Sequence, residues 1–173
     1  MTRSRTQAGY SLVEVLVVVA ILGIMAAIGF PSLRGLLPRI RLNNDAMILA
    51  NEIALARVRA ISKSADVRIV FDDANDRYAF GKLQGNAWVD LGWTNLKGSD
   101  LQAVSGFNTA SILPAVPPET LVLSGRGAAN VPLGTQAAIE LRTPTGDHRK
   151  QILVETTGRT VVRRWSGGAW DQE

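Results

Sequence analysis

One uninterrupted apolar segment, Val15–Phe30, constrains this chain more than any other feature. It contains no charged residue, and a single carboxylate, Glu14, directly precedes it. Counted from Tyr10, the helix expected here is roughly 30 Å long, about the thickness of the hydrocarbon core of a bilayer. A lone carboxylate in a membrane-length segment is costly, so Glu14 is expected to have a functional partner.

The residues before this segment, Met1–Ala8, are polar and carry Arg3 and Arg5. A secretory signal peptide would end at a small-residue cleavage site. Here the small residues Ala26 and Ala27 are followed by Gly29–Phe30–Pro31, and the helical pattern continues past them. A plain membrane anchor explains the length but explains neither Glu14 nor the abrupt junction at residues 9–10.

The string Gly9–Tyr10–Ser11–Leu12–Val13–Glu14, followed by the apolar run and then Pro31, resembles the leader of type IV pilin-like proteins. The resemblance implies that a prepilin peptidase cuts after Gly9 and N-methylates Tyr10, although Phe is more usual at that position. It also implies that Glu14 neutralises the terminal amine of a neighbouring subunit during assembly. A carboxylate among apolar helices requires such a partner.

Three segments follow from this interpretation: a leader at 1–9, a transmembrane and assembly helix at 10–35, and a periplasmic domain at 36–173. Arg3 and Arg5 hold the leader in the cytoplasm by the positive-inside rule. The chain is therefore expected to cross the bacterial inner membrane once, with its C-terminal domain in the periplasm. The expected partners are inner-membrane lipid, the prepilin peptidase and other pilins or pseudopilins in a hetero-oligomeric filament.

The helical pattern continues beyond the apolar run as an amphipathic segment at 36–63. Apolar residues recur there at helical spacing, with charged residues between them. The apolar positions are Leu36, Ile40, Met47, Ala50, Ala54, Val58 and Ile61. Together with the membrane segment, they predict one helix from about Tyr10 to Ser62.

From residue 65 the pattern changes to the alternation of strands, so 65–173 is predicted to be β-rich. Residues 66–71 and 77–83 are predicted to form a hairpin, and 86–93 a third strand with Trp88 and Trp93 half buried. Residues 97–118 are rich in Gly, Ser, Asn and Pro and are predicted to form a long loop. Further strands are expected at 120–124, 137–142, 151–156 and 160–165. The predicted fold is α+β, with the long N-terminal helix packed on an antiparallel sheet.

The C-terminal half narrows the resemblance. Segments 124–128, 134–141 and 151–159, together with 53–61 of the helix, resemble the GspH/FimT family of minor pseudopilins and minor pilins. The resemblance implies a structural subunit and no enzyme. We expect a minor pseudopilin of a type II secretion system, active in protein export across the outer membrane. The alternative is a FimT-like minor pilin of a type IV pilus.

No catalytic, metal or cofactor site is predicted. The chain has no cysteine, and its one histidine, His148, lies in a polar turn without a partner motif. The acidic turn at 72–76 lacks the spacing of a calcium loop, so a solvated hairpin turn is the better interpretation. The net charge is only +4, and two of these charges belong to the leader. Overall charge is therefore weak evidence for a nucleic-acid partner.

Basic residues nevertheless gather near the C-terminus. The candidate DNA-binding residues are Arg149, Lys150, Arg159, Arg163 and Arg164. Trp165 and Trp170 follow them and could stack on bases. The resemblance implies DNA contact during transformation for some FimT-type pilins, through a Gly-Arg-containing region that corresponds to Gly158–Arg159. The alternative is a solvated edge strand whose charges prevent aggregation.

Overall fold

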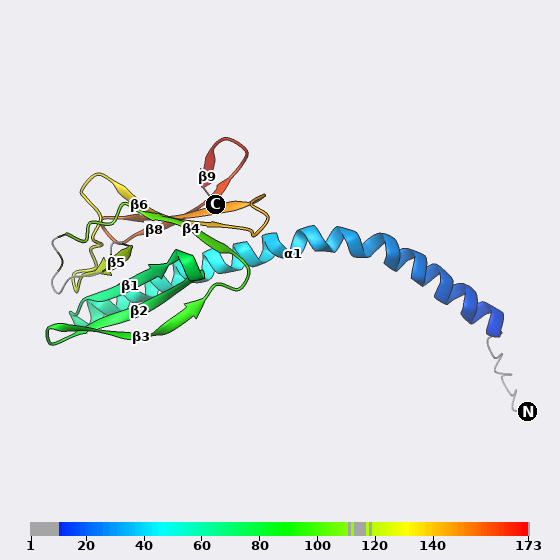
Figure 1. Ribbon diagram of the computed structural model, residues 1–173, viewed down its shortest axis with the longest axis horizontal. Helices are drawn as coiled ribbons and strands as arrows, with labels where there is room; N and C mark the ends of the chain where they lie inside the picture. Colours follow the sequence, from blue (N-terminus) through cyan, green and yellow to red (C-terminus); the bar gives the residue numbers. More distant parts are fainter. Residues whose placement is uncertain (1–10, 111, 113–116, 118, 173) are drawn as a thin grey trace, which may run out of the picture. The chain divides into compact units, whose positions relative to one another are not determined.

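The computed structural model of the chain describes residues 11–110, 112, 117 and 119–172, without the side chains of 28–34. These residues form a long α-helix, a short 3₁₀ helix and two antiparallel sheets (Figure 1). The chain divides into two compact units, Met1–Leu37 and Pro38–Glu173. This arrangement confirms the predicted α+β class.

Helix α1, Leu12–Lys63, covers the predicted helix almost residue for residue. It ends at Lys63. The next residue, Ser64, has a left-handed φ of 47°, and the Ala65 N–H donates to the Ala60 carbonyl at 3.1 Å. Within the described residues, no helix holds an apolar stretch long enough to cross a membrane.

In the second unit, α1 buries one stripe of side chains. The stripe repeats every three or four residues, as expected for a helix with a single core-facing side. Its members are each at most 1% exposed: Leu42, Ala46, Leu49, Ile53, Ala56 and Ala60. The three alanines leave room for strands to approach the helix axis closely. This stripe forms one cluster with inward side chains of both sheets. It is not the stripe predicted from the sequence. Of the predicted positions only Ala50 is buried, whereas the side chains of Leu36, Ile40, Met47, Val58 and Ile61 are 44–59% exposed.

The first sheet has the strand order β3-β2-β1-β5. Its strands are β1 (Val67–Asp72), β2 (Arg77–Gln84), β3 (Ala87–Asn95) and β5 (Thr120–Leu123). The predicted hairpin is confirmed, because β1 pairs with β2 across the 3₁₀ turn Asp73–Asn75. Ile69, Phe71 and Tyr78 face the core from this hairpin.

The second sheet has the strand order β4-β6-β7-β8-β9. Its strands are β4 (Asp100–Ser105), β6 (Gln136–Arg142), β7 (Arg149–Glu155), β8 (Thr160–Trp165) and β9 (Trp170–Gln172). The side chains of Ile139, Leu141, Ile152 and Val154 are fully buried on its inner face.

Three further expectations need correction. The chain forms two sheets instead of one, because β4 leaves the first sheet and pairs with β6. The predicted loop at 97–118 therefore contains a strand, whose alternation is hidden by an irregularity between Leu101 and Ala103. The third correction concerns β8, which is an edge strand only in its first half: β9 pairs with its second half, Trp165 opposite Trp170.

Candidate functional site

The start of α1 places Glu14 in the first helical turn. The Ser11 carbonyl accepts from the N–H groups of Glu14 and Val15, at 3.0 and 3.2 Å, and Ser11 Oγ accepts from Val13 N–H. A carboxylate is favourable here because free N–H groups and the helix dipole give this end partial positive charge. Within the chain, the exposed Glu14 carboxylate has no salt bridge to a described residue. Gly9 and Tyr10, the predicted cleavage and methylation positions, lie outside the described residues.

The first part of α1 exposes apolar side chains on every side. Every residue from 11 to 27 is exposed, and the large hydrophobic side chains among them are between 51% and 77% exposed. They include Leu12, Val13, Leu16, Val18, Ile21, Leu22, Ile24 and Met25. A helix that is apolar all round requires an apolar environment, either lipid or other helices. Glu14 is the only charged residue in this stretch.

The predicted basic residues do not form one cluster, because the strand pairing divides them between two faces. Lys150 and Arg164 lie opposite each other in the β7–β8 register, on the inner face of the sheet. The Lys150 side chain is buried, and its Nζ donates to Asn43 Oδ1 of α1 at 2.5 Å. The remaining strand residues, Arg149 and Arg163, belong to the outer face.

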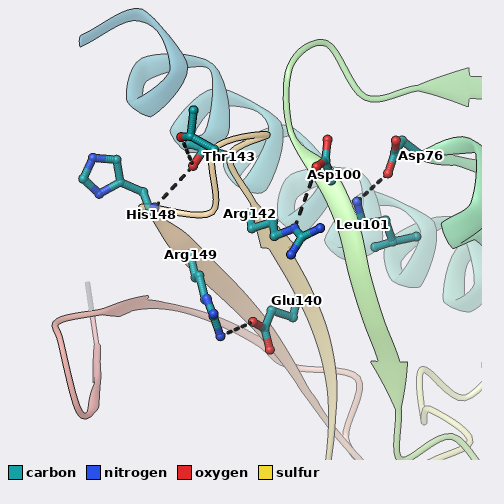
Figure 2. A network of polar contacts seen from close by, with 9 residues as sticks. Asp76, Asp100, Leu101, Glu140, Arg142, Thr143, His148 and Arg149 are labelled. Atoms are coloured by element: carbon teal, nitrogen blue, oxygen red, sulfur yellow. Dashed lines mark hydrogen bonds and ion pairs between the residues drawn. The ribbon is translucent and has the colours of Figure 1, made fainter. Parts of the chain in front are cut away.

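On that outer face a third arginine, Arg142, lies directly opposite Arg149. Figure 2 shows the pairs they form with carboxylates: Arg149 Nη1 is 3.6 Å from Glu140 Oε1, and Arg142 Nε is 3.8 Å from Asp100 Oδ2. Both distances are longer than that of a good hydrogen bond, and partly exposed ion pairs of this kind contribute little to stability.

Arg163 completes this outer face, two strands from Glu140 through Gln151. Its Nε is buried without a hydrogen-bond partner among the described residues. Beside it Trp165 packs edge-on against Trp170, with ring centroids 5.2 Å apart. We call Arg142, Arg149, Arg163 and Trp165 the outer arginine face. Arg142 was missed from the sequence because only the β6–β7 register places it there.

Arg159 lies apart from this face, at the turn between β7 and β8. Gly158 has a φ of 75° and packs against Arg57, which donates from Nε to the Gly127 carbonyl at 3.0 Å. Arg159 itself is exposed and lines a pocket of about 460 Å³ together with Asn43 and Met47 of α1.

The two polar turns have protein partners of their own. In the acidic turn, Asp72 Oδ2 accepts from Arg77 Nε at 2.7 Å and from the Asn75 amide at 2.9 Å, and both interactions lower the Asp72 pKa. The His148 N–H donates to Thr143 Oγ1 at 3.3 Å (Figure 2). Among the described residues, no group of three His, Cys, Asp or Glu side chains could hold a metal ion.

Comparison with known proteins gives one family and several structures. The family described as "Prokaryotic N-terminal methylation motif" matches residues 4–30. No curated protein sequence matches significantly. A structure of the minor pseudopilin EpsH from the type II secretion system of Vibrio cholerae is similar, with a TM-score of 0.55 and 16% identity over 75% of this chain and 99% of that chain.

A crystal structure of the same V. cholerae pseudopilin gives a TM-score of 0.55 at 17% identity, over 76% of this chain and 97% of that chain. A crystal structure of the type IV minor pilin FimU of Pseudomonas aeruginosa gives a TM-score of 0.52 at 15% identity, over 78% of this chain and 96% of that chain. At such identities the likeness establishes the fold. The chain therefore carries an N-terminal methylation motif and has the fold of the minor pseudopilin EpsH and the minor pilin FimU.

Proposed function

We propose that this chain is a minor pseudopilin, a structural and non-enzymatic subunit of a type II secretion pseudopilus. The observation that carries the proposal is the methylation motif at residues 4–30 in a chain whose two sheets have the fold of minor pseudopilins. In this role a prepilin peptidase removes residues 1–9 and methylates Tyr10. Residues 10–35 lie in the inner membrane before assembly, and 36–173 lie in the periplasm.

The exposed apolar side chains of residues 12–27 support assembly with other subunits. In a filament, helices of neighbouring subunits replace lipid around these side chains. The Glu14 carboxylate then loses its water and requires a cation, which the methylated amine of a neighbouring subunit supplies. Both requirements are met by the same helix bundle.

Intact mass of the protein isolated from its own cells tests the processing step. The expected chain begins at Tyr10 and carries one methyl group on its amine. A chain that begins at any other residue contradicts the proposal.

Deletion of the gene tests which assembly uses the subunit, a type II secretion system or a type IV pilus. For a type II secretion system, exported proteins should accumulate in the periplasm while pili still form. Loss of pili with normal export would instead assign the chain to a type IV pilus.

A FimT-like minor pilin that binds DNA at a pilus tip is the second candidate, and the outer arginine face favours it. Arg142, Arg149 and Arg163 share one face with Trp165, and among the described residues two long ion pairs, to Asp100 and Glu140, partly offset their charge. Arginines can contact phosphates, while tryptophan can stack on exposed bases.

This candidate predicts that the unit 38–173 binds duplex DNA, with affinity that falls steeply as salt rises. Arg149→Ala and Arg163→Ala should each weaken binding, whereas Lys82→Ala, an exposed cation on the other sheet, should not. Arg159→Ala measures the separate contribution of the β7–β8 turn. Absence of binding at low salt, or equal losses in all variants, would reject DNA binding by this face.

A further inference from the structure

The first half of β8 has no described neighbour on the side away from β7. Strand β9 pairs with β8 only from Arg163 to Trp165, and no described residue is paired with Thr160–Val162 on that side. The hydrogen-bonding groups of an unpaired strand edge can bind the backbone of another chain. This short edge is therefore a candidate interaction surface.

The backbone of Thr160 presents its polar groups to the open side. At the start of β8, the Glu155 N–H donates to the Arg159 carbonyl at 2.9 Å, so Arg159 faces β7. Successive residues of an antiparallel strand face its two neighbours in turn. Val161 therefore faces β7 as well, whereas the N–H and C=O groups of Thr160 point away from it. An extended chain that lies along this edge could bond to both groups.

A groove runs along the same edge, between α1 and β8. It is the pocket of about 460 Å³ that Arg159 lines, and this volume is within the usual range of ligand-binding sites. Its apolar lining comes from Met47 of α1 and from Val161 and Val162 of β8. Such a lining, next to a strand edge, suits the side chains of a bound peptide.

The polar groups of the groove are mainly hydrogen-bond donors. Arg159 is the one charged residue among the described residues that line it, and no described carboxylate forms an ion pair with Arg159. The Asn43 Oδ1 atom accepts from Lys150 Nζ, which leaves the amide N–H groups of Asn43 to donate. Together with the Thr160 N–H, these donors match a carboxylate, which only accepts hydrogen bonds.

The direction of an added strand decides which of its ends meets these donors. Strand β9 runs antiparallel to β8, and a strand with the same direction beside Thr160–Val162 would end at Arg159. The groove ends there too, because the preceding residue, Gly158, packs against α1: a Cβ on Gly158 would lie 2.9 Å from Arg57 Cδ. The C-terminus of a chain therefore fits this place better than an internal acidic segment does.

We propose that the groove between α1 and β8 binds the C-terminal residues of a separate protein, as an added strand whose terminal carboxylate pairs with Arg159. An extended backbone bonds to the strand edge, and alternate side chains enter the apolar part. A second copy of this chain is a poor occupant, because its residues Trp170–Gln172 already form β9. The proposal goes beyond the proposed function and does not depend on which filament contains the chain.

Retention of synthetic peptides by the immobilised full-length chain in detergent tests the site. The probe is a pool of short peptides with randomised C-terminal positions, made once with a free C-terminal carboxyl group and once with a C-terminal amide. The free-acid pool should be retained at least about tenfold more strongly, because only a carboxylate forms a charge-assisted bond to arginine. Equal retention of the two pools, or retention of neither, overturns the proposal.

Substitutions then locate the binding. Arg159→Ala should lower the retention of the free-acid pool about tenfold, to the level of the amide pool. Arg159→Lys keeps the charge and should retain part of the binding. Lys82→Ala is the matched control, because Lys82 is an exposed cation of the other sheet. An unchanged thermal unfolding midpoint shows that the fold of Arg159→Ala is intact. Equal retention by the Arg159→Ala and Lys82→Ala variants overturns the proposal.

Methylation of the peptide backbone tests the added strand. In the most strongly retained peptide, a methyl group replaces the N–H hydrogen of one residue at a time. Because only alternate residues of the peptide face β8, retention should fall about tenfold at one position and little at its two neighbours. Equal effects at successive positions would show that the peptide does not bind as a strand, and would overturn the proposal.

Discussion

The guanidinium of Arg68 reaches across β2 and donates from Nη2 to Oδ1 of Asp90 at 2.8 Å, with a second bond from Nε at 3.1 Å. The two residues belong to β1 and β3, and Gly81 of the strand between them lies under the contact. A Cβ on Gly81 would lie 2.7 Å from Asp90 Oδ1 and 2.8 Å from Arg68 Nε. The absent side chain is therefore what allows this pair to form.

Replacing Gly81 with alanine should break the Arg68–Asp90 pair. Both side chains can move away, so the loss is that of a partly exposed ion pair and its packing on Trp88, about 1 kcal/mol. Urea denaturation of the unit 38–173 measures it as a lower free energy of unfolding. Gly168→Ala is the matched control, since a Cβ there meets no atom within 4 Å. Equal effects of the two substitutions would contradict the role given to Gly81.

The buried hydroxyl of Tyr78 should make the stability of the fold depend on pH in the alkaline range. Its hydroxyl donates to Glu52 Oε2 at 2.5 Å, and burial followed by this carboxylate raises the Tyr78 pKa well above its ordinary value. The unfolded chain then loses the tyrosine proton at lower pH than the folded chain. This contribution to stability is complete below the unfolded pKa of about 10 and is lost as pH rises through the folded pKa.

The free energy of unfolding should therefore fall above pH 10, by at most about 1.4 kcal/mol per pH unit from this one group. Tyr78→Phe should flatten that slope and should also destabilise the chain at neutral pH by about 1–3 kcal/mol, because Glu52 loses its donor. Denaturation series at several pH values for both proteins provide the measurement. An identical alkaline slope in the two proteins would show that Tyr78 does not titrate as described.

Local patterns were sufficient to predict that the helix and most strands exist. They did not predict which side of the helix is buried, since Met47, Val58 and Ile61 were expected on that side and are 45–59% exposed. Alternation identified β1 and β2, and the polar turn between them fixed their antiparallel pairing. The same alternation could not assign strands to sheets, because inner faces of both sheets are buried in one core. It also missed β4, in which only Leu101 is fully buried and the pairing is irregular.

The residues of the candidate site likewise divide into those that the sequence predicts and those that only the structure reveals. The leader motif depends on consecutive residues, so sequence alone identified Gly9, Tyr10 and Glu14 as candidates. The outer arginine face depends on the register between strands, which the sequence does not show. Lys150 and Arg149 are adjacent in the chain, yet one is buried against α1 and the other is exposed. An irregularity in the pairing of β2 with β3, which residue propensities do not predict, places Trp93 beside Arg77.

Replacing Asp45 should cause a large and local loss of stability. It is only 6% exposed on α1 and accepts from Ser99 Oγ at 2.8 Å and from Lys97 N–H at 3.1 Å. Asp45→Ala would leave these donors without an acceptor and should cost about 2–3 kcal/mol. Asp45→Asn keeps one oxygen acceptor and should cost less. Guanidinium denaturation gives both values.

Hydrogen exchange distinguishes this local effect from general loosening. The Lys97 amide should exchange faster in Asp45→Ala, because it loses its acceptor, while amides of β7 should change only in proportion to global stability. Asn44→Ala is the control, since Asn44 is an exposed neighbour on the same helix. Uniform acceleration throughout the unit would show that Asp45 does not specifically hold the connection between β3 and β4.

The last prediction concerns the charge of Glu14. Glu14→Gln keeps the size of the side chain but cannot neutralise a neighbouring amine, which would then be an unpaired charge among apolar helices. Because an unpaired buried charge costs roughly 3–5 kcal/mol, incorporation into filaments should fall more than about a hundredfold. Intact mass should still show a methylated chain beginning at Tyr10, since in the proposed function the cut after Gly9 precedes assembly. Glu14→Asp, which keeps the charge, should retain part of the incorporation. Filaments containing the Gln variant at the unsubstituted level would mean that Glu14 has no cationic partner.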